Sequence, residues 1–191
     1  IVAPHLAAIA DSGVKLISNA GGVNPEACGR AIRQLIEDAG LSLKVAVITG
    51  DDLMPKLDEV LAAEPAEMFT GEPTPPRDAI ASANAYLGAF PVAQALNQGA
   101  DIVVTGRCVD SAVTLGACIH RFGWQRNDLD LLAAGSLAGH LIECGPQATG
   151  GNYTAWHEVA DTLHEVGYPS AELAADGGVV MTKPKGTGGC V

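Results

Sequence analysis

The sequence predicts an α/β protein with three layers, in which a mainly parallel sheet carries helices on both faces. Two observations predict this class. Short apolar segments that end in glycine or polar residues alternate with longer helical patterns, and hydrophobic residues make up 48% of the chain while aromatic residues make up only 4%. Small apolar side chains are typical of packing between helices and a sheet. This apolar content also argues against disorder.

Three apolar segments, too short for helices and bounded by turn residues, are the predicted buried strands. They cover residues 14–18, 43–50 and 101–106. After the first of them, Asn24 is a good helix N-cap, Pro25 suits the first helical position and Gly40 ends the predicted helix. The other predicted elements are helices over 1–13, 51–64, 78–99 with a kink or break at Pro91, 107–123, 128–145 and 159–167, and a final strand over 177–184. The alternation of strands and helices predicts right-handed crossovers between parallel strands.

The chain is expected to form a single α/β domain over residues 1–191, and to be an internal fragment of a longer protein. It begins with Ile1 and ends in a glycine-rich segment that resembles the approach to another element. The net charge of −11 and the eleven scattered Lys and Arg residues exclude a nucleic-acid partner, which needs a clustered basic surface.

The sequence also predicts in which cellular compartment the protein is found. Its apolar runs fall short of the roughly 20 residues that a membrane-spanning helix needs, so no membrane association is predicted. The five cysteines are odd in number and contain no C-x-x-C pair, which favours reduced thiols in a cytoplasmic protein.

The first predicted strand ends in a polar, glycine-containing turn. Ligands of parallel α/β sheets bind beyond the carboxyl ends of the strands, where such turns meet. Asn19, Gly21, Gly22 and Asn24 precede a helix start, where backbone N–H groups can face an anion. The same turn fits a plain strand-to-helix connection. It matches neither the Rossmann nor the Walker fingerprint.

The third predicted strand ends in a similar turn, made of Thr105, Gly106, Arg107 and, further on, Asp110. Arg107 can hold a carboxylate or a phosphate in bidentate fashion, or it can pair with Asp110 at the start of a helix.

A third glycine-rich loop, with Lys183, Thr187 and Gly188, follows the final strand. Such a loop is either an anion-binding segment or a solvated basic loop. Because three polar, glycine-rich turns exceed what connectivity requires, they together predict one anion-binding crevice.

The segment GHLIECGPQATGG, residues 139–151, contains the candidate catalytic side chains. In a helix, His140, Glu143 and Cys144 lie at i, i+3 and i+4 and share one face. Glu143 or His140 can act as a general acid or base, or Cys144 can be a nucleophile with His140 as its base. The segment can also be a helix end with polar packing. A metal site would need further ligands that no recognised motif supplies, so neither a metal nor a cofactor is predicted.

The glycine-rich turn that follows can hold a substrate carbonyl. Its candidate residues are Gln147, Gly150 and Gly151.

Five motifs in this order resemble the acyclic terpene utilisation AtuA family: LISNAGGVNPEA, GADIVVTGRCVDSA, AGHLIECGPQATGG, GYPSAEL and TKPKGTGG. They extend over essentially the whole chain. The resemblance implies a place in the catabolism of acyclic isoprenoids such as citronellol and geraniol, which are degraded as branched acyl-CoA thioesters.

The resemblance leaves three functions open. The first is an enzyme that acts on a branched acyl-CoA by hydration, dehydration or carbon–carbon cleavage. The second is a non-catalytic acyl-CoA-binding or assembly subunit, and the third is a hydrolase that uses Cys144. The implied partners are an acyl-CoA-like small molecule and either a second copy of the chain or another catabolic enzyme.

Overall fold

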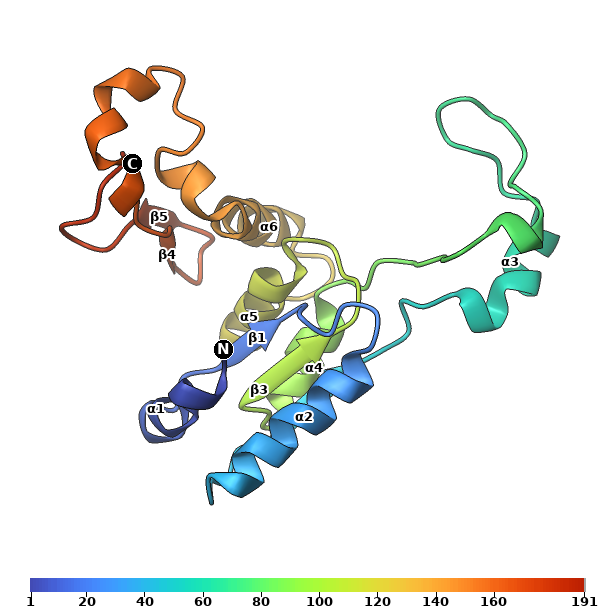
Figure 1. Cartoon of the computed structure of the whole chain (residues 1–191), viewed down its shortest axis with the longest axis horizontal. Helices are drawn as coiled ribbons and strands as arrows, with labels where there is room; N and C mark the ends of the chain where they lie inside the picture. The colour runs from blue at the N-terminus through green and yellow to red at the C-terminus, as the bar shows by residue number, and fades with distance from the viewer. Residues whose placement is uncertain (191) are drawn as a thin grey trace. The chain divides into compact units, whose positions relative to one another are not determined.

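A computed structural model of the chain describes residues 1–190 and divides them into two compact units. The first unit contains Ile1–Gly88 and Gly99–Val109, and the second contains Ala89–Gln98 and the chain from Asp110 onward. The elements of both units are labelled in Figure 1. The α/β class is confirmed, whereas the single domain over residues 1–191 stays a prediction.

The first unit is built on a three-stranded parallel sheet in the order β1-β3-β2. Its strands are β1 (Leu16–Ser18), β2 (Val45–Ile48) and β3 (Ile102–Thr105). The central strand aligns Val103 with Ile17 of β1 and Ala46 of β2. All three strands lie within the predicted segments, and their parallel pairing is confirmed. The three-layer arrangement stays a prediction.

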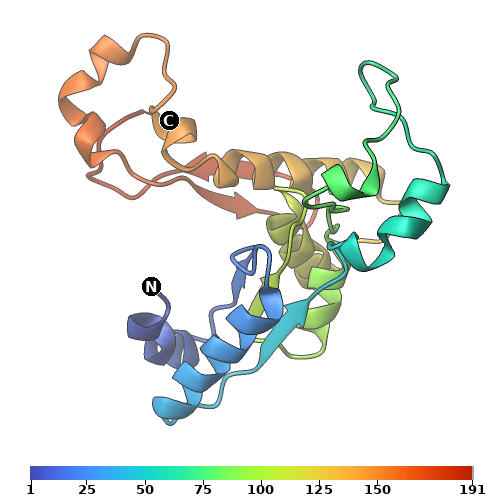
Figure 2. The same cartoon turned by 45° about the vertical axis from the view of Figure 1, so that its right-hand side comes forward.

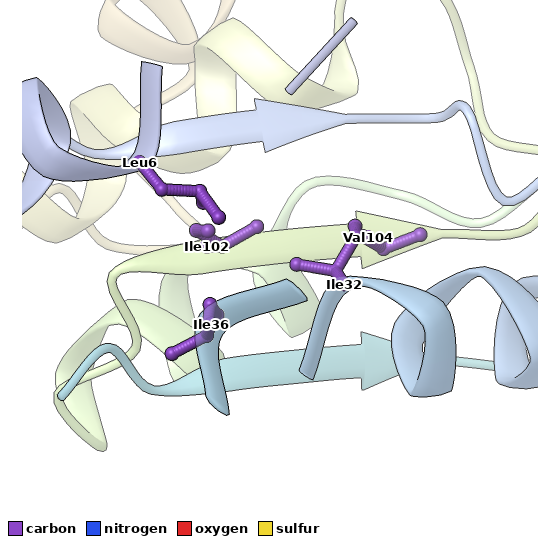
Figure 3. Packing of buried hydrophobic residues seen from close by; sticks show 5 residues of the cluster. All are labelled: Leu6, Ile32, Ile36, Ile102 and Val104. Atoms are coloured by element: carbon purple, nitrogen blue, oxygen red, sulfur yellow. The ribbon is translucent and has the colours of Figure 1, made fainter. Parts of the chain in front are cut away.

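Helices cover one face of this sheet and form the core of the unit. They are η1 (Ala3–His5), α1 (Leu6–Ser12) and α2 (Pro25–Asp38). Figure 3 shows Leu6 of α1 and Ile32 and Ile36 of α2 packed against Ile102 and Val104 of β3. Residues four apart on a helix and two apart on a strand each share one face, so this sequence spacing produces the cluster.

After β2 the chain leaves the sheet in a long connection that contains η2 (Met54–Lys56), α3 (Leu57–Ala62) and η3 (Arg77–Ala79) (Figure 2). It comes back to the strand ends over residues 81–87, which are called the returning segment below. The helix predicted over 78–99 is wrong in its first half. Residues 83–87 are extended and pair with strand-end segments: Leu53 N–H donates to Ala83, Ala85 N–H to Asp51 and Leu87 N–H to Arg107. These long-range hydrogen bonds override the local helical tendency of an alanine-rich segment.

Within the described residues, the second unit contains three α-helices, of which α5 (Ala112–Phe122) contacts both α4 (Phe90–Asn97) and α6 (Leu129–Glu143). Pro91 lies in the first turn of α4, so it starts this helix rather than kinking a longer one. Glycine permits close packing between α4 and α5, because a Cβ on Gly116 would lie 2.5 Å from Cβ of Val92.

The rest of the second unit is less regular and consists of 3-10 helices and a pair of short strands. Its elements are η4 (Gly145–Thr149), η5 (Trp156–Glu158), η6 (Ala160–Glu165), β4 (Ser170–Leu173) and β5 (Val179–Thr182). The predicted final strand is confirmed as β5, which pairs antiparallel with β4, a strand not predicted from the sequence. The helix predicted over 159–167 is a 3-10 helix instead. Within residues 1–190, no helix has the length and apolar character needed to cross a bilayer.

Candidate functional site

A cleft of about 430 Å³ lies at the carboxyl edge of the parallel sheet, within the first unit. This is the edge at which ligands of parallel α/β sheets bind. Three segments line the cleft: residues 24–26 at the start of α2, residues 49–52 directly after β2, and Ala81, Ser82 and Asn84 in the segment that returns to the sheet. The cleft is large enough for part of a small-molecule substrate.

Asp51 is the buried carboxylate of this cleft, with only 3% of its surface exposed. Its Oδ2 accepts hydrogen bonds from the backbone N–H of Arg107 at 2.8 Å and from Nδ2 of Asn84 at 3.1 Å. Gly106 packs directly against it, since an added Cβ would lie 2.1 Å from Asp51 Oδ1. One carboxylate therefore ties the ends of β2 and β3 to the returning segment. Buried charges are retained when they are hydrogen-bonded in this way.

The turn after β1 is held together by its own hydrogen bonds. Gly22 N–H donates to the carbonyl of Asn19, and Asn24 N–H donates to that of Gly21. Gly22 has a φ of +51°, and a Cβ on Gly21 would lie 2.4 Å from the carbonyl oxygen of Thr105. The positive φ of Gly22 and the close approach of Gly21 to β3 explain why glycine is needed at these two positions. Anion binding by the turn stays a prediction.

Asn24 confirms the predicted cap of α2. Its Oδ1 accepts a hydrogen bond from the backbone N–H of Ala27 at 2.9 Å. Because Asn24 also lines the cleft, the positive end of the α2 dipole is directed at this space.

In the turn after β3, the Thr105 side chain is buried in the first unit and the Arg107 side chain is exposed to solvent. Thr105 is completely buried, and its hydroxyl donates to the carbonyl of Gly106. Arg107 is exposed, with its guanidinium 5.3 Å from the centre of the Tyr86 ring and one nitrogen donating to the Tyr86 hydroxyl at 3.0 Å. The aromatic ring thus holds the cation at the strand end.

In the second unit, the structure brings His140, Glu143 and Cys144 together at the end of α6, as their helical spacing predicts. His140 Nδ1 lies 3.9 Å from Glu143 Oε1, and the Cys144 thiol donates to the same oxygen at 3.1 Å. The side chains of His140 and Glu143 are 65% and 37% exposed.

This hydrogen bond to Glu143 raises the pKa of the Cys144 thiol, and desolvation and the negative charges of Glu143 and Asp110 raise it further. A raised pKa works against Cys144 as a thiolate nucleophile.

Two of the predicted glycine-rich loops lie side by side in this unit. The N–H of Cys190 donates to the carbonyl of Thr149, and a Cβ on Gly150 would lie 3.0 Å from Gly189 Cα. Gly188 is also closely packed, because its added Cβ would overlap the carbonyl oxygen of Thr162.

The predicted side chains of these loops are occupied within the loops themselves. Lys183 Nζ donates to the carbonyls of Thr187 at 2.6 Å and Gly188 at 2.9 Å. Gln147 Oε1 accepts a hydrogen bond from Asn152 at 2.9 Å. A cavity of about 410 Å³ lies beside them, lined by Gln147, Ala148, Gly150, Asn152, Tyr153 and Cys190.

The model of one protein family, described as acyclic terpene utilisation family protein AtuA, matches residues 1–191. The chain belongs to the AtuA family. Membership gives it a role in acyclic terpene utilisation. No curated protein and no solved structure matches the chain.

In this AtuA family chain, the predicted site residues fall into two groups. The first unit holds Asn19, Gly21, Gly22, Asn24, Thr105, Gly106 and Arg107, and the second holds Asp110, His140, Glu143, Cys144, Gln147, Gly150, Gly151, Lys183, Thr187 and Gly188. A single crevice formed by all of them stays a prediction.

Sequence reasoning missed Asp51 and Asp52 in this AtuA family chain, although both line the cleft. Their signal was available, because two carboxylates directly follow the predicted strand over 43–50. Asn84 had no such signal, since it lies in a segment predicted to be helical.

Proposed function

We propose that this AtuA family protein is an enzyme that acts on a branched acyl-CoA thioester by hydration, dehydration or carbon–carbon cleavage. The cleft at the carboxyl edge of the sheet carries the proposal, because it combines the start of α2 with fixed carboxylates. The substrate class is part of the proposal and is what the resemblance to the AtuA family implies, namely that acyclic isoprenoids such as citronellol and geraniol are degraded as branched acyl-CoA thioesters.

The charge of the cleft determines which end of the substrate it suits. Glu26, Asp51 and Asp52 all line it. Carboxylates at this density disfavour the phosphates of CoA, so the cleft is the proposed place for the thioester and the acyl chain. Arg107, exposed beside Tyr86 in the same unit, is the proposed ligand for phosphate.

The chemistry needs a polarised thioester carbonyl and a group that moves a proton. The positive end of α2 supplies polarisation, since its dipole favours the negative charge that develops on the carbonyl oxygen. Asp52 is the proposed proton-transferring group. It is exposed to the cleft, and its Oδ1 is oriented by the backbone N–H of Met54 at 2.9 Å. Asp51, buried next to it, is a positioning residue.

The His140–Glu143 pair is the second candidate for proton transfer, because the two side chains are exposed and close to each other. Matched variants distinguish the two places. Asp52→Asn is expected to lower kcat by at least about 100-fold, the usual contribution of a positioned acid or base. If Glu143→Gln has this effect and Asp52→Asn does not, proton transfer belongs to the second unit.

Asp101→Asn is the control. It makes the same substitution directly before β3, at the opposite edge of the same sheet, and is expected to leave kcat unchanged.

The proposal is tested by incubating the purified protein with geranyl-CoA and its carboxylated and hydrated derivatives, followed by mass spectrometry. Gain or loss of water, or a shortened acyl chain, is the expected result. Measurable binding of these thioesters without any turnover would instead favour a non-catalytic acyl-CoA-binding or assembly subunit.

A further inference from the structure

We propose that His140, Glu143 and Cys144 form a three-ligand site for Zn²⁺ at the C-terminal end of α6, with water in the fourth position. The proposal does not depend on the acyl-CoA function or on the cleft of the first unit.

The spacing of the three donor atoms is close to that of a zinc site. Each residue offers one ligand atom, and these atoms all lie within 4.8 Å of one another. Zinc bonds of about 2.0 to 2.3 Å at tetrahedral angles place neighbouring ligand atoms roughly 3.3 to 3.6 Å apart. The distance from Glu143 Oε1 to Cys144 Sγ is 3.1 Å and the distance from Glu143 Oε1 to His140 Nδ1 is 3.9 Å. The first is slightly shorter and the second slightly longer than the separation of two neighbouring zinc ligands. Zinc binding therefore requires side-chain rotations that draw the three donor atoms, which lie at most 4.8 Å apart, to bonding distance.

The chemistry of the donors selects the metal. One imidazole nitrogen, one carboxylate oxygen and one thiolate sulfur are all established zinc ligands. Mg²⁺ and Ca²⁺ prefer oxygen alone, so a site with sulfur and nitrogen disfavours them. Three protein ligands with an open fourth position is the pattern of zinc sites that keep a bound water.

The electrostatics at this end of α6 favour a cation. The site lies in the last turn of a 15-residue helix, where the dipole carries partial negative charge. Asp110 acts electrostatically on Cys144 and adds a second negative charge to that of Glu143. Gly139 allows the segment after Asp110 to pack tightly on the helix, because an added Cβ would lie 2.8 Å from the carbonyl oxygen of Ser111.

Zinc reaches the site from solvent, since His140 and Glu143 are both well exposed. On binding, the Cys144 sulfur releases its proton to solvent and bonds to the metal in its place. The hydrogen bond from Cys144 to Glu143 is exchanged for two metal bonds, and no redox change is involved. Neutral His140 contributes the lone pair of one ring nitrogen.

The test titrates the purified, chelator-treated protein with Co²⁺ and then Zn²⁺. Co²⁺ reports zinc sites because a cobalt–thiolate bond gives an ultraviolet charge-transfer absorption. We expect one Co²⁺ per chain with this absorption, and its loss when Zn²⁺ is added. Cys144→Ser is expected to abolish the absorption. Both Cys144→Ser and His140→Ala are expected to weaken Zn²⁺ binding, measured by calorimetry, by at least about 10- to 100-fold, the loss that even outer-shell changes cause.

Two matched controls in the same unit separate this site from adventitious binding. Cys190→Ser removes another partly exposed thiol, and His164→Ala removes a histidine that lies 3.6 Å from Glu165. Neither change is expected to alter the absorption or the affinity. The proposal is overturned if Cys144→Ser retains the absorption, if His140→Ala binds Zn²⁺ like the unchanged protein, or if wild-type protein binds no Co²⁺.

Discussion

Replacing Gly106 by alanine is expected to destabilise the first unit, because the glycine lies against the buried carboxylate that joins two strand ends. The added Cβ would lie 2.1 Å from Asp51 Oδ1, 2.6 Å from its Cγ and 2.8 Å from Oδ2. Ordinary van der Waals contact between such atoms begins near 3.5 Å, so the carboxylate has to move by more than about 1 Å.

The size of the effect follows from what this movement breaks. Asp51 Oδ2 holds Arg107 N–H at 2.8 Å and Asn84 Nδ2 at 3.1 Å. A hydrogen bond to a charged group contributes about 1.5 to 3 kcal/mol, and water in the adjoining cleft can replace part of it. We therefore expect Gly106→Ala to lower the free energy of unfolding by about 2 to 4 kcal/mol, measured by urea unfolding followed by circular dichroism.

Two further variants make this prediction specific. Gly88→Ala is the control in the same unit, since an added Cβ there meets no heavy atom within 4 Å. Asp51→Ala removes the three atoms that the methyl group would meet, so Gly106→Ala should cost about 1 to 3 kcal/mol less in that background. The contact between Gly106 and Asp51 would be refuted if Gly106→Ala and Gly88→Ala lowered the free energy of unfolding equally. It would also be refuted if Gly106→Ala caused the same loss in wild-type protein and in the Asp51→Ala variant.

Three other substitutions test separate parts of the fold. The two carboxylate oxygens of Asp101 accept hydrogen bonds from the Lys15 ammonium and from the backbone N–H of residue 44, and these bonds lower the pKa of Asp101. Asp101→Asn removes the charge and replaces one of these two acceptor oxygens by an NH2 group. The stability that the carboxylate contributes is therefore present above its unfolded pKa and is lost as pH falls through the lower folded pKa, so the variant should be about 1 to 2 kcal/mol less stable at pH 7 and equal to wild type in strong acid; a pH-independent difference would contradict this. Ile102→Ala empties a position that is 1% exposed at the centre of the core cluster and should cost about 2 to 5 kcal/mol in urea unfolding; a loss below 1 kcal/mol would mean that the cluster is not packed as described. Lys183→Met removes the ammonium that holds the carbonyls of Thr187 and Gly188, so hydrogen exchange of the loop over 183–190 should become faster; unchanged exchange with lost thioester binding would instead indicate an anion ligand.

Local sequence patterns predicted the elements whose stability is local. The cap of α2 at Asn24 needs only the chain within three residues, and the shared face of His140, Glu143 and Cys144 needs only one helical turn. Both are present in the structure for that reason. The three parallel strands were equally readable, because a strand buried inside an α/β protein is apolar along its length.

The error over residues 78–89 has the opposite cause. This alanine-rich segment has a helical tendency, yet its backbone pairs with residues 51–53 and 107–109, far away in the chain. Propensity describes a segment alone, whereas these hydrogen bonds depend on the sheet being formed first.

The sequence by itself determined the class of the fold, the positions of the three parallel strands and the family to which the chain belongs, since each of these depends on patterns within short segments. Tertiary structure alone decided which polar groups meet when they lie far apart in the sequence. Asn84, Asp51 and Gly106 are separated by tens of residues, and a buried carboxylate joins them only after two strand ends and the segment with Asn84 have come together. It also decided that Lys183 is bound by its own loop, because donors and acceptors are assigned by the folded backbone and not by residue type.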